Sequence, residues 1–492
     1  MPGLTTSLNI GLSGLQAAQG ALSITGHNIA NVNTENYSRQ RVELSANKPQ
    51  TFGSMSFGSG VSVANITGLR NQYLELQIAK TTSREKGANV RYEGVEGISA
   101  VFEDDGTTGL STLLQNYFEA FQQLAASPED AAVRTNVVGK AQNLVDGLQS
   151  RYQMLEDQRT QADENIKNMT EEVNTLTSQI AELNHRISQE ASPGADSDGR
   201  DQRQALVNQL AGLVGIQVYE DSSKCLQITL ESGTAALVSG NHAYEMTATP
   251  DGTPNHFATV AVKMGSLTVD VTGQISEGSL GANLDLRDDI LLGYEDQLDQ
   301  LAAGIVSQTN LVHQAGYALD GTTTDVDFFQ GALANGANGL PTSISAADNY
   351  HGMVKAMTLN SAIVTDHSLI AASDTTGAVG NNKNALALAK LQDKTDSVDT
   401  NGDGVGDSGP FGAMVSGLVN DIGTDIQSYK INSTSQENLL AALQTQRDRA
   451  SAVDMDEEAA NLITYQRGYQ ASAHFISVIN DLTSQLLTQL GA

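Results

Sequence analysis

The chain has 492 residues, with 57 acidic side chains against 27 lysines and arginines, which gives a formal net charge of −30. An acidic surface repels phosphate backbones, so we expect no nucleic-acid partner, and no run of about 18 apolar residues predicts insertion into a membrane. The single cysteine, Cys225, excludes an intrachain disulfide and a thiolate zinc site, and is best interpreted as a small buried hydrophobic residue.

The N-terminal segment has the pattern of a helix that packs along another helix. Apolar residues recur every seven positions, at Leu8, Leu15, Leu22 and Ile29. A second row between them contains the small residues Gly11 and Ala18, which allow a partner backbone to approach closely. The same segment has neither a cationic start nor a continuous apolar stretch, so we expect no cleavable signal peptide.

This helix is predicted to end in an asparagine-rich stretch, after which the chain becomes extended. The stretch reads "NIANVNTENYSRQRV" from Asn28 to Val42. Asparagine side chains satisfy the backbone groups that lack partners at a helix end, and Asn36 is a residue type that tolerates a positive φ. We therefore expect a helix end followed by a turn.

The middle of the chain carries a long helical repeat. From Val145 to Ile187, apolar residues alternate in steps of three and four, and only Arg159 interrupts them. Pro128 and Pro193 bracket the repeat, as prolines often bracket helices. About 60 residues at 1.5 Å each predict a helix of roughly 90 Å, which is unusual in a compact enzyme.

After this repeat the periodicity changes. Short β-prone segments separated by Gly, Pro and Asp predict a small β domain over residues 216–280. Helical spacing then returns, with a predicted start between Asp285 and Ile290, and residues 320–380 are predicted to form loops and short strands. Another helix is predicted after Thr434, the first residue of the capping box "TSQE".

The C-terminal segment repeats the seven-residue pattern of the N-terminal one. Acidic residues between Asp454 and Glu458 favour a helix start there. The apolar rows contain Leu462, Tyr469, Ile476 and Leu490 in one and Ile479 and Leu486 in the other. Two interpretations are open: two amphipathic helices on one globular core, or a coiled coil of the two termini that also packs against neighbouring copies.

Together these elements predict a mainly α fold with an inserted β domain, built from discontinuous domains. The terminal coiled-coil domain is expected to comprise residues 1–50 plus 450–492. The other parts are an elongated helical-bundle domain over 51–215, 281–325 and 380–449, the β domain over 216–280, and a loop and short-strand region over 326–379.

One loop has the spacing of a calcium site. In "DTNGDGVGD", Asp399, Asn401, Asp403 and Asp407 supply oxygen atoms at loop positions one, three, five and nine. Hard oxygen ligands at this spacing suit Ca²⁺, but Pro410 stands where an EF-hand has a bidentate Glu. The loop is interpreted either as a calcium site or as a solvated acidic loop, and no other cofactor is expected.

The remaining residues that could take part in catalysis form no known catalytic motif, so we expect no enzyme. The histidines are scattered, and His27 and His474 on the terminal helices are expected to lie in a core or at the surface rather than to bind a metal. The sequence contains no nucleophile elbow, phosphate loop or zinc-protease motif, and its one G-x-G-x-x-G, at 404–409, follows no strand and lies among carboxylates. We therefore expect a structural or binding protein.

The asparagine-rich stretch resembles the N-terminal signature of the axial proteins of the bacterial flagellum. The residues that carry this resemblance are Asn28, Asn31, Asn33, Thr34, Tyr37, Ser38 and Arg39. Four further stretches, 201–218, 284–302, 384–392 and 454–482, resemble the flagellar hook-associated protein 1 family, in the same order along the chain. The alternatives are another axial protein, such as a hook protein or a flagellin-like protein, and a secreted calcium-dependent binding module.

The resemblance implies a structural subunit at the junction between hook and filament, located outside the cell. It implies export in an unfolded state through the flagellar type III apparatus, with an export chaperone on the C-terminal helix. It also implies terminal helices that are disordered in the free subunit and pair in a ring of identical copies, next to the hook protein and the second junction protein. The single cysteine agrees with passage through a narrow channel.

Overall fold

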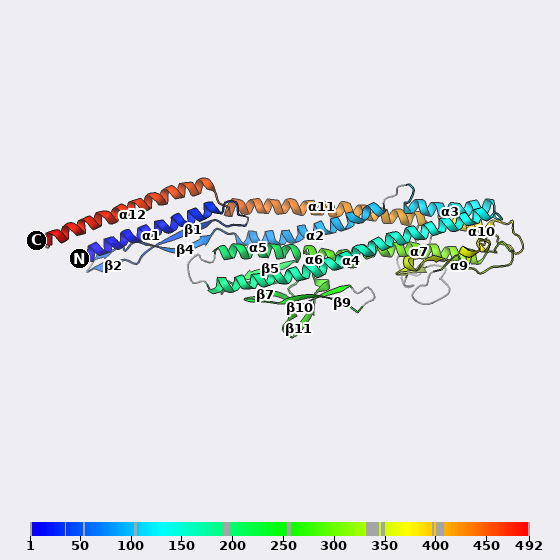
Figure 1. Cartoon of the computed structure of the whole chain (residues 1–492), viewed down its shortest axis with the longest axis horizontal. Helices are drawn as coiled ribbons and strands as arrows, with labels where there is room; N and C mark the ends of the chain where they lie inside the picture. The colour runs from blue at the N-terminus through cyan, green and yellow to red at the C-terminus, as the bar shows by residue number, and fades with distance from the viewer. Residues whose placement is uncertain are drawn as a thin grey trace. The chain divides into compact units, whose positions relative to one another are not determined.

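The structure is a computed structural model that describes residues 2–34, 36–52, 55–102, 106–189, 197–252, 257–330, 344–345, 350–395, 398–399 and 408–490. It is mainly α-helical with several small sheets, which confirms the predicted fold class (Figure 1). The chain divides into two compact units. The first unit contains Met1–Gly87, Lys167–Gly281 and Thr434–Ala492, and the second contains Ala88–Ile166 and Ala282–Ser433.

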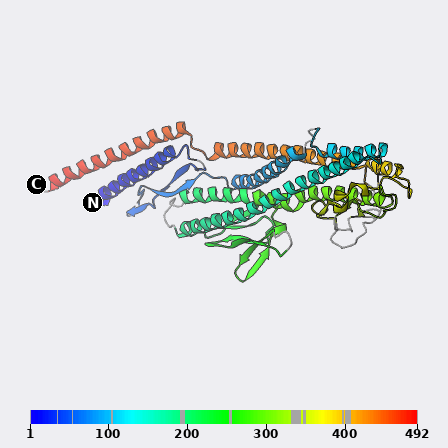
Figure 2. The same cartoon turned by 45° about the vertical axis from the view of Figure 1, so that its right-hand side comes forward.

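The two ends of the chain meet in the first unit. α1 (Pro2–Ala30) and α12 (Met455–Leu490) lie side by side and antiparallel, as Figures 1 and 2 show from two directions. The carboxylate of Asp454 accepts the backbone N–H groups of Asp456 and Glu457, at 2.9 and 3.3 Å, and so caps the start of α12. The predicted acidic start of the C-terminal helix is confirmed.

Four short strands follow α1, namely β1 (Gln40–Ala46), β2 (Gln50–Phe52), β3 (Met55–Phe57) and β4 (Val61–Gly68). β1 pairs antiparallel with β4, and β2 pairs antiparallel with β3. The extended chain expected after the asparagine-rich stretch is therefore present. The last of these strands ends at Gly68, whereas the predicted helical domain begins at residue 51.

The β domain also belongs to the first unit, and α5 (Ser197–Leu213) precedes it. One sheet has the order β5-β6-β7-β8 and the other the order β11-β10-β9. The strands are β5 (Ile216–Glu220), β6 (Leu226–Leu230), β7 (Ala236–Ser239), β8 (His242–Ala243), β9 (Glu245–Pro250), β10 (Ala258–Met264) and β11 (Leu267–Asp270), followed by the short 3₁₀ turn η1 (Thr272–Gln274).

Two asparagines of α4 (Ala131–Gln189) attach one strand of each sheet to the helix. The Asn184 amide donates to the backbone oxygen of Leu226 at 2.9 Å and accepts its N–H at 3.0 Å. Asn174 makes the same pair of bonds with Met246, both at 2.7 Å. Because each amide bonds to a backbone donor and a backbone acceptor, these hydrogen bonds offset the cost of removing the polar groups from water.

α4 is the long helix that the repeat predicts. Its 59 residues correspond to a length of roughly 90 Å at 1.5 Å per residue. The positions of the repeat from Val145 to Ile187 are buried, except Met169, which is half-buried. Within the described part of the chain, no helix is both long enough and apolar enough to cross a membrane.

The second unit is built from helices around an aromatic core. Tyr117, Phe118 and Phe121 of α3 (Leu110–Ala126) are fully buried; the Tyr117 ring packs against both of the others, and Phe121 packs against Phe328. The unit comprises the end of α2 (Gln72–Phe102), α3 (Leu110–Ala126), the first part of α4, the end of α6 (Gly278–Asp285), α7 (Leu291–Gln314), β12 (Phe329–Gln330), β13 (Ile344–Ser345), α8 (Met353–Ala356), β14 (Thr358–Leu359), α9 (Ser361–Thr365), η4 (His367–Leu369), α10 (Lys383–Lys390), η5 (Leu391–Asp393), β15 (Val398–Asp399) and most of α11 (Phe411–Ser451).

The helix expected to start between Asp285 and Ile290 begins earlier, so this prediction is wrong. α6 starts at Gly278, and the chain continues through a π-helical turn, η2 (Leu286–Ile290), directly into α7. Gly278 has a φ of +80°, and a Cβ atom there would lie 2.5 Å from the backbone oxygen of Leu213. Only glycine fits at this tight entry to the helix.

The helix expected to begin after Thr434 is likewise part of a longer one. α11 starts at Phe411 and passes through Thr434, so the capping box is not used. The sequence pattern that indicates the earlier start lies before Thr434. It is a row of buried apolar residues at helical spacing, Phe411, Val415, Leu418 and Ile422.

The arginine that interrupts the repeat of α4 belongs to a buried ion-pair network in the second unit. Arg159 donates to the carboxylate of Glu295 and, at 2.8 Å, to the backbone oxygen of Arg287. Arg287 in turn donates to Asp163 at 2.6 Å. The π-helical turn carries Arg287, so the irregular backbone brings this residue between two residues of α4. Burial raises the pKa of Glu295 to about 7, despite the neighbouring Arg159.

We expect the carboxyl group of Glu295 to make the free energy of unfolding fall as pH rises. The folded chain holds the Glu295 proton more tightly than the unfolded chain, whose pKa is near 4.5. The stabilising contribution is therefore complete below pH 4.5 and is lost as pH rises through about 7. Relative to Glu295→Gln, the wild type should lose up to about 1.4 kcal/mol of unfolding free energy per pH unit in that window.

Denaturant unfolding at pH 5 and pH 8 measures this pH dependence, with substitution of the exposed Glu164 by glutamine as control. An unchanged difference between wild type and Glu295→Gln at the two pH values would contradict it.

Candidate functional site

The contact between α1 and α12 depends on small residues. A Cβ atom at Gly11 would lie 2.8 Å from Cγ1 of Ile476 and 3.0 Å from Cδ1 of Phe475, and one at Gly14 would lie 3.0 Å from Oγ of Ser472. These distances are shorter than ordinary van der Waals contact. The two helices can pack this closely because these two positions carry no side chain.

The predicted interface residues are only partly covered within one chain. On α1, Leu8 is exposed, and Leu15, Leu22 and Ile29 are half-buried. On α12, Leu462, Ile476 and Ile479 are half-buried, Tyr469 and Leu486 are exposed, and the side chain of Leu490 lies outside the described residues. The buried positions of α1 include Gly11, Ala17, Ala21 and Thr25. The small residues of α1, rather than its seven-residue row of large ones, therefore form its most buried face.

Further large apolar side chains are exposed on both helices. They are Leu12 on α1 and Met455, Ile463, Phe475, Val478, Leu482 and Leu487 on α12. Apolar surface that recurs along a helix in this way marks a contact with another molecule. The terminal pair thus has one covered face and one face available to a partner.

The signature residues form a hydrogen-bonded turn at the end of α1. Oδ1 of Asn28 accepts the Tyr37 hydroxyl at 2.8 Å and the N–H of Gln40 at 2.9 Å, and its Nδ2 donates to the Gln40 oxygen at 2.9 Å. Burial, with the nearby carboxylate of Asp198, raises the pKa of Tyr37, so its hydroxyl remains a donor. Asn28 therefore fixes the first residue of β1 against the last turn of α1.

The other asparagines stabilise the turn itself. Asn31 donates to the backbone oxygen of His27 at 3.0 Å and accepts the Thr34 hydroxyl at 3.1 Å. Asn36 has a φ of +60°, which confirms its expected backbone conformation, and Asn33 is exposed. Asn31 thus satisfies a backbone group at the helix end, as the sequence predicts.

Arg39 joins this turn to the start of α12. Its Nε donates to Glu458 and its Nη1 to Glu457, both at 2.7 Å, and its backbone N–H donates to the Ser451 oxygen at 2.9 Å. The bond to Glu457 raises the pKa of Arg39, and Arg39 lowers the pKa of Glu457. Arg447 adds a bond to the side chain of Asn36 at 2.8 Å. The ends of the chain are thus tied together by charge as well as by helix packing.

The same turn is attached to α5. The N–H of Ser38 donates to Asp201 at 3.1 Å, and Nε of Arg70 donates to the Ser38 hydroxyl at 3.0 Å. Arg70 also pairs with Asp201. Gln40 donates to Asp198 at 2.7 Å. The signature turn therefore connects α1, α5 and α12.

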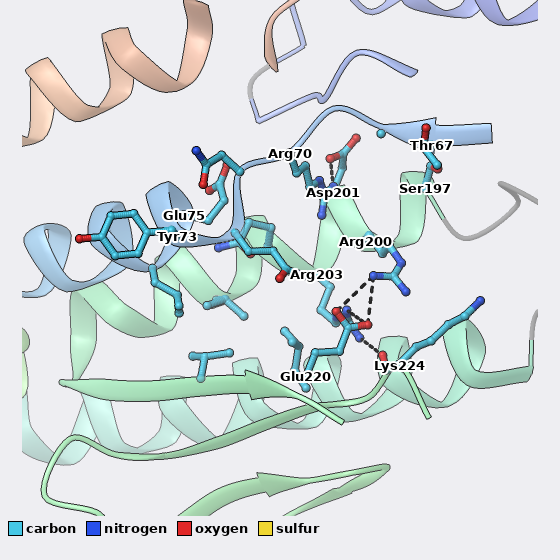
Figure 3. A pocket seen from close by; sticks show the side chains of 18 of the residues that line it. Thr67, Arg70, Tyr73, Glu75, Ser197, Arg200, Asp201, Arg203, Glu220 and Lys224 are labelled. Carbon is cyan, nitrogen blue, oxygen red and sulfur yellow. Dashed lines mark hydrogen bonds and ion pairs between the residues drawn. The ribbon is translucent and has the colours of Figure 1, made fainter. Parts of the chain in front are cut away.

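A charged cleft of about 1040 Å³ lies beside this connection. Its walls are the segment from β4 into α2 and the first turns of α5, with β5 as a further side. Figure 3 shows Arg200 and Arg203 meeting around Glu220, at N–O distances of 3.0 and 3.7 Å. Arg70 and Asp201 form a second pair in the same view.

The residues considered for cofactors are placed as follows. Asn401, Asp403 and Asp407 lie outside the described residues, and only the backbone of Asp399, in β15, is described. Calcium binding there stays a prediction, which calorimetry with Ca²⁺ on the wild type and on Asp403→Ala tests. Cys225 is buried, and burial raises the pKa of its thiol, which agrees with a hydrophobic role.

Among the described residues, Asp296, Asp299 and His351 are close enough together to hold a metal ion. His351 already contacts Asp296 at 2.7 Å, and the carboxylate of Asp299 accepts the N–H groups of Gly352 and Val354 at 2.6 and 2.8 Å. These contacts give the cluster a structural role in holding the start of α8. His27 is also structural, because its ring packs edge-on against Tyr37, whereas His474 is exposed.

Sequence reasoning missed Arg70, Asp201 and Arg447, which hold the signature turn. Arg70 and Arg447 lie in no local motif, and the resemblance of the stretch 201–218, which begins at Asp201, does not indicate which residue Asp201 contacts. The Ser38–Asp201 bond joins residues 163 positions apart, and the Arg447–Asn36 bond joins residues 411 positions apart. A single sequence carries no signal for pairs at such separations.

Three family models match this chain. The flagellar hook-associated protein FlgK helical domain matches residues 95–329, the flagella basal body rod protein matches 8–37, and the flagellar basal body rod FlgEFG protein C-terminal matches 444–490. Flagellar hook-associated protein 1 of Escherichia coli (strain K12) is 27% identical, over 98% of this chain and 100% of its own length. The chain is thus similar to flagellar hook-associated protein 1 over nearly its full length. The protein of that name from Bacillus subtilis (strain 168) is 25% identical, over 97% of this chain and 96% of its own.

A solved structure shares the fold. It is that of the flagellar hook junction protein FlgK from Burkholderia pseudomallei, which matches 76% of this chain and 99% of its own with a TM-score of 0.64 and 17% identity. Flagellar hook-associated protein 1 belongs to a structural family and not to an enzyme family. The chain is accordingly an axial component of the flagellum, assembled outside the cell with other axial components. The two rod models cover most of α1 and α12 and part of the signature turn.

Proposed function

We propose that this chain is a structural, non-catalytic subunit of the junction between hook and filament. The observation that carries the proposal is the closely packed pair of α1 and α12, which leaves a series of large apolar side chains exposed. A single copy cannot cover that surface, whereas a ring of identical copies covers it repeatedly. The printed description of the Burkholderia pseudomallei protein as a hook junction protein supports the same location.

The proposal includes the route of assembly. The chain leaves the cell unfolded through the flagellar type III apparatus, with an export chaperone on its C-terminal helix. α1 and α12 become ordered when sister copies, the hook protein and the second junction protein contact them. Two features support this: isolated helices are marginally stable without packing, and Cys225 is the only cysteine, so no intrachain crosslink opposes unfolding.

Electron microscopy of cells that lack this chain tests the location. We expect hooks of normal length without attached filaments, and filament protein released into the medium, because the adaptor between the two polymers is missing. Restoring the chain from a plasmid should restore attachment. Filaments that remain attached to hooks in its absence would contradict the proposal.

Limited proteolysis of the purified chain tests the coupling of order to assembly. We expect a monomer in which a protease removes roughly the first and last 40 residues quickly, because α1 and α12 leave much apolar surface in water and lack lattice partners. Mass spectrometry should find a resistant core that retains α4 and the β domain. Ends as resistant as α4 would contradict this route of assembly.

A further inference from the structure

The charged cleft of the first unit has a charge balance opposite to that of the chain. Its lining contains four cations, Arg70, Arg200, Arg203 and Lys224, against three anions, Glu75, Asp201 and Glu220. The local formal charge is therefore 4 − 3 = +1, on a chain with a net charge of −30. Arg200 and Arg203 also share one carboxylate, that of Glu220.

The surroundings of the cleft favour additional negative charge. α2 and α5 both begin at it, at Gln72 and Ser197, so the positive ends of two helix dipoles face the same volume. Burial, together with the nearby Arg200 and Arg203, lowers the pKa of Arg70 to about 10. An incoming carboxylate would relieve this crowding of cations.

The rim of the cleft has the composition of a protein interface. Tyr73 on α2 is 71% exposed and Tyr219 on β5 is 62% exposed, which makes them the most exposed aromatic side chains of the described chain. Leu76 beside them is also exposed. Tyrosine and arginine are enriched where proteins meet, since they offer area and hydrogen bonds at low entropic cost. In Figure 3, Tyr73 and Lys224 lie at opposite ends of the cluster of ion pairs.

We propose that this cleft receives an acidic segment of a second copy of the chain in the assembled flagellum. The proposal rests on the proposed function, which brings identical copies side by side. A second copy supplies the complementary charge, because 57 of its residues are acidic. A contact between this cleft and a different surface of the next copy is heterologous, the type that generates a ring or a helical array.

Photo-crosslinking in intact flagella tests the proposal. The photoreactive residue benzoylphenylalanine replaces Tyr73 or Tyr219, in chains produced together with the unmodified chain so that assembly continues. Leu267 is the matched control, because it is comparably exposed, at 58%, but lies on β11 outside the cleft. We expect light to link the chain to a second copy from Tyr73 and from Tyr219, and not from Leu267.

Charge reversal adds a second measurement. Lys224→Glu, and Arg200→Glu together with Lys224→Glu, should lower the yield of linked copies about tenfold, because like charges then face each other. Lys263→Glu on β10 should leave the yield unchanged, and thermal melting checks that each variant folds. A link to a different protein, or no link in cells whose filaments are attached, overturns the cleft proposal and leaves the junction role intact.

Discussion

Replacing Arg39 by alanine is expected to release filaments from their hooks. The substitution removes the cation that faces Glu457 and Glu458, and the Glu458 side chain is only 2% exposed. A buried carboxylate without its partner costs about 3 kcal/mol, enough to separate the signature turn from the start of α12. Arg39→Lys should give an intermediate result, because an ammonium group cannot reach two carboxylates in the fork geometry of a guanidinium.

Swimming in soft agar and counts of attached filaments by electron microscopy measure this effect. Arg41→Ala is the matched control, since Arg41 lies two residues further along the chain and is exposed. Arg39→Ala combined with Glu458→Gln should recover part of the attachment, because the buried charge is removed as well. If the Arg39→Ala variant swims like the wild type, the ion pairs of Arg39 with Glu457 and Glu458 do not hold the two ends of the chain together.

The second large effect is expected at Gly11. Leucine at this position would place its Cβ 2.8 Å from Cγ1 of Ile476 and its remaining atoms in the contact between α1 and α12. Overpacking of this kind costs about 1–3 kcal/mol and here also displaces one helix from the other. We expect Gly11→Leu to lose most attached filaments, and Gly11→Ala to lose fewer, since the Ile476 side chain can move.

Gly26 provides the matched control within α1. Apart from the neighbouring backbone of α1, no atom lies within 4 Å of a Cβ placed there, so Gly26→Ala adds no clash and gains up to about 1 kcal/mol of helix propensity. The same counts of attached filaments compare the variants. If Gly11→Leu and Gly26→Ala behave alike, close helix packing at Gly11 does not determine attachment.

Local patterns predicted a large part of the fold. The repeat from Val145 to Ile187 identified α4, because apolar periodicity over so many turns has no other structural interpretation. The asparagine-rich stretch identified the end of α1 and the positive φ of Asn36, since residue types within the stretch itself favour both. In each case the determining interactions lie within a few residues of one another.

Other features could not be predicted because they depend on distant parts of the chain. Arg39 and Glu458 are 419 positions apart, and either residue alone has the pattern of a solvated surface charge. The π-helical turn at Leu286–Ile290 adjusts the backbone so that Arg287 reaches Asp163 on another helix. The close contact of α1 with α12 at Gly11 and Gly14 was predicted only in part, because the seven-residue row of large residues gives a stronger sequence pattern than the glycines.

The antiparallel pairing of the first helix with the last has a consequence for the quality of the assembled organelle. Because the ribosome synthesises α12 after α1, a polypeptide that ends before Met455 contains α1 without the helix that pairs with it. Such a fragment lacks Ile476 opposite Gly11 and Glu458 opposite Arg39. Under the proposed route of assembly, such a fragment cannot complete the contact between α1 and α12, and we expect it to be left out of the assembled flagellum.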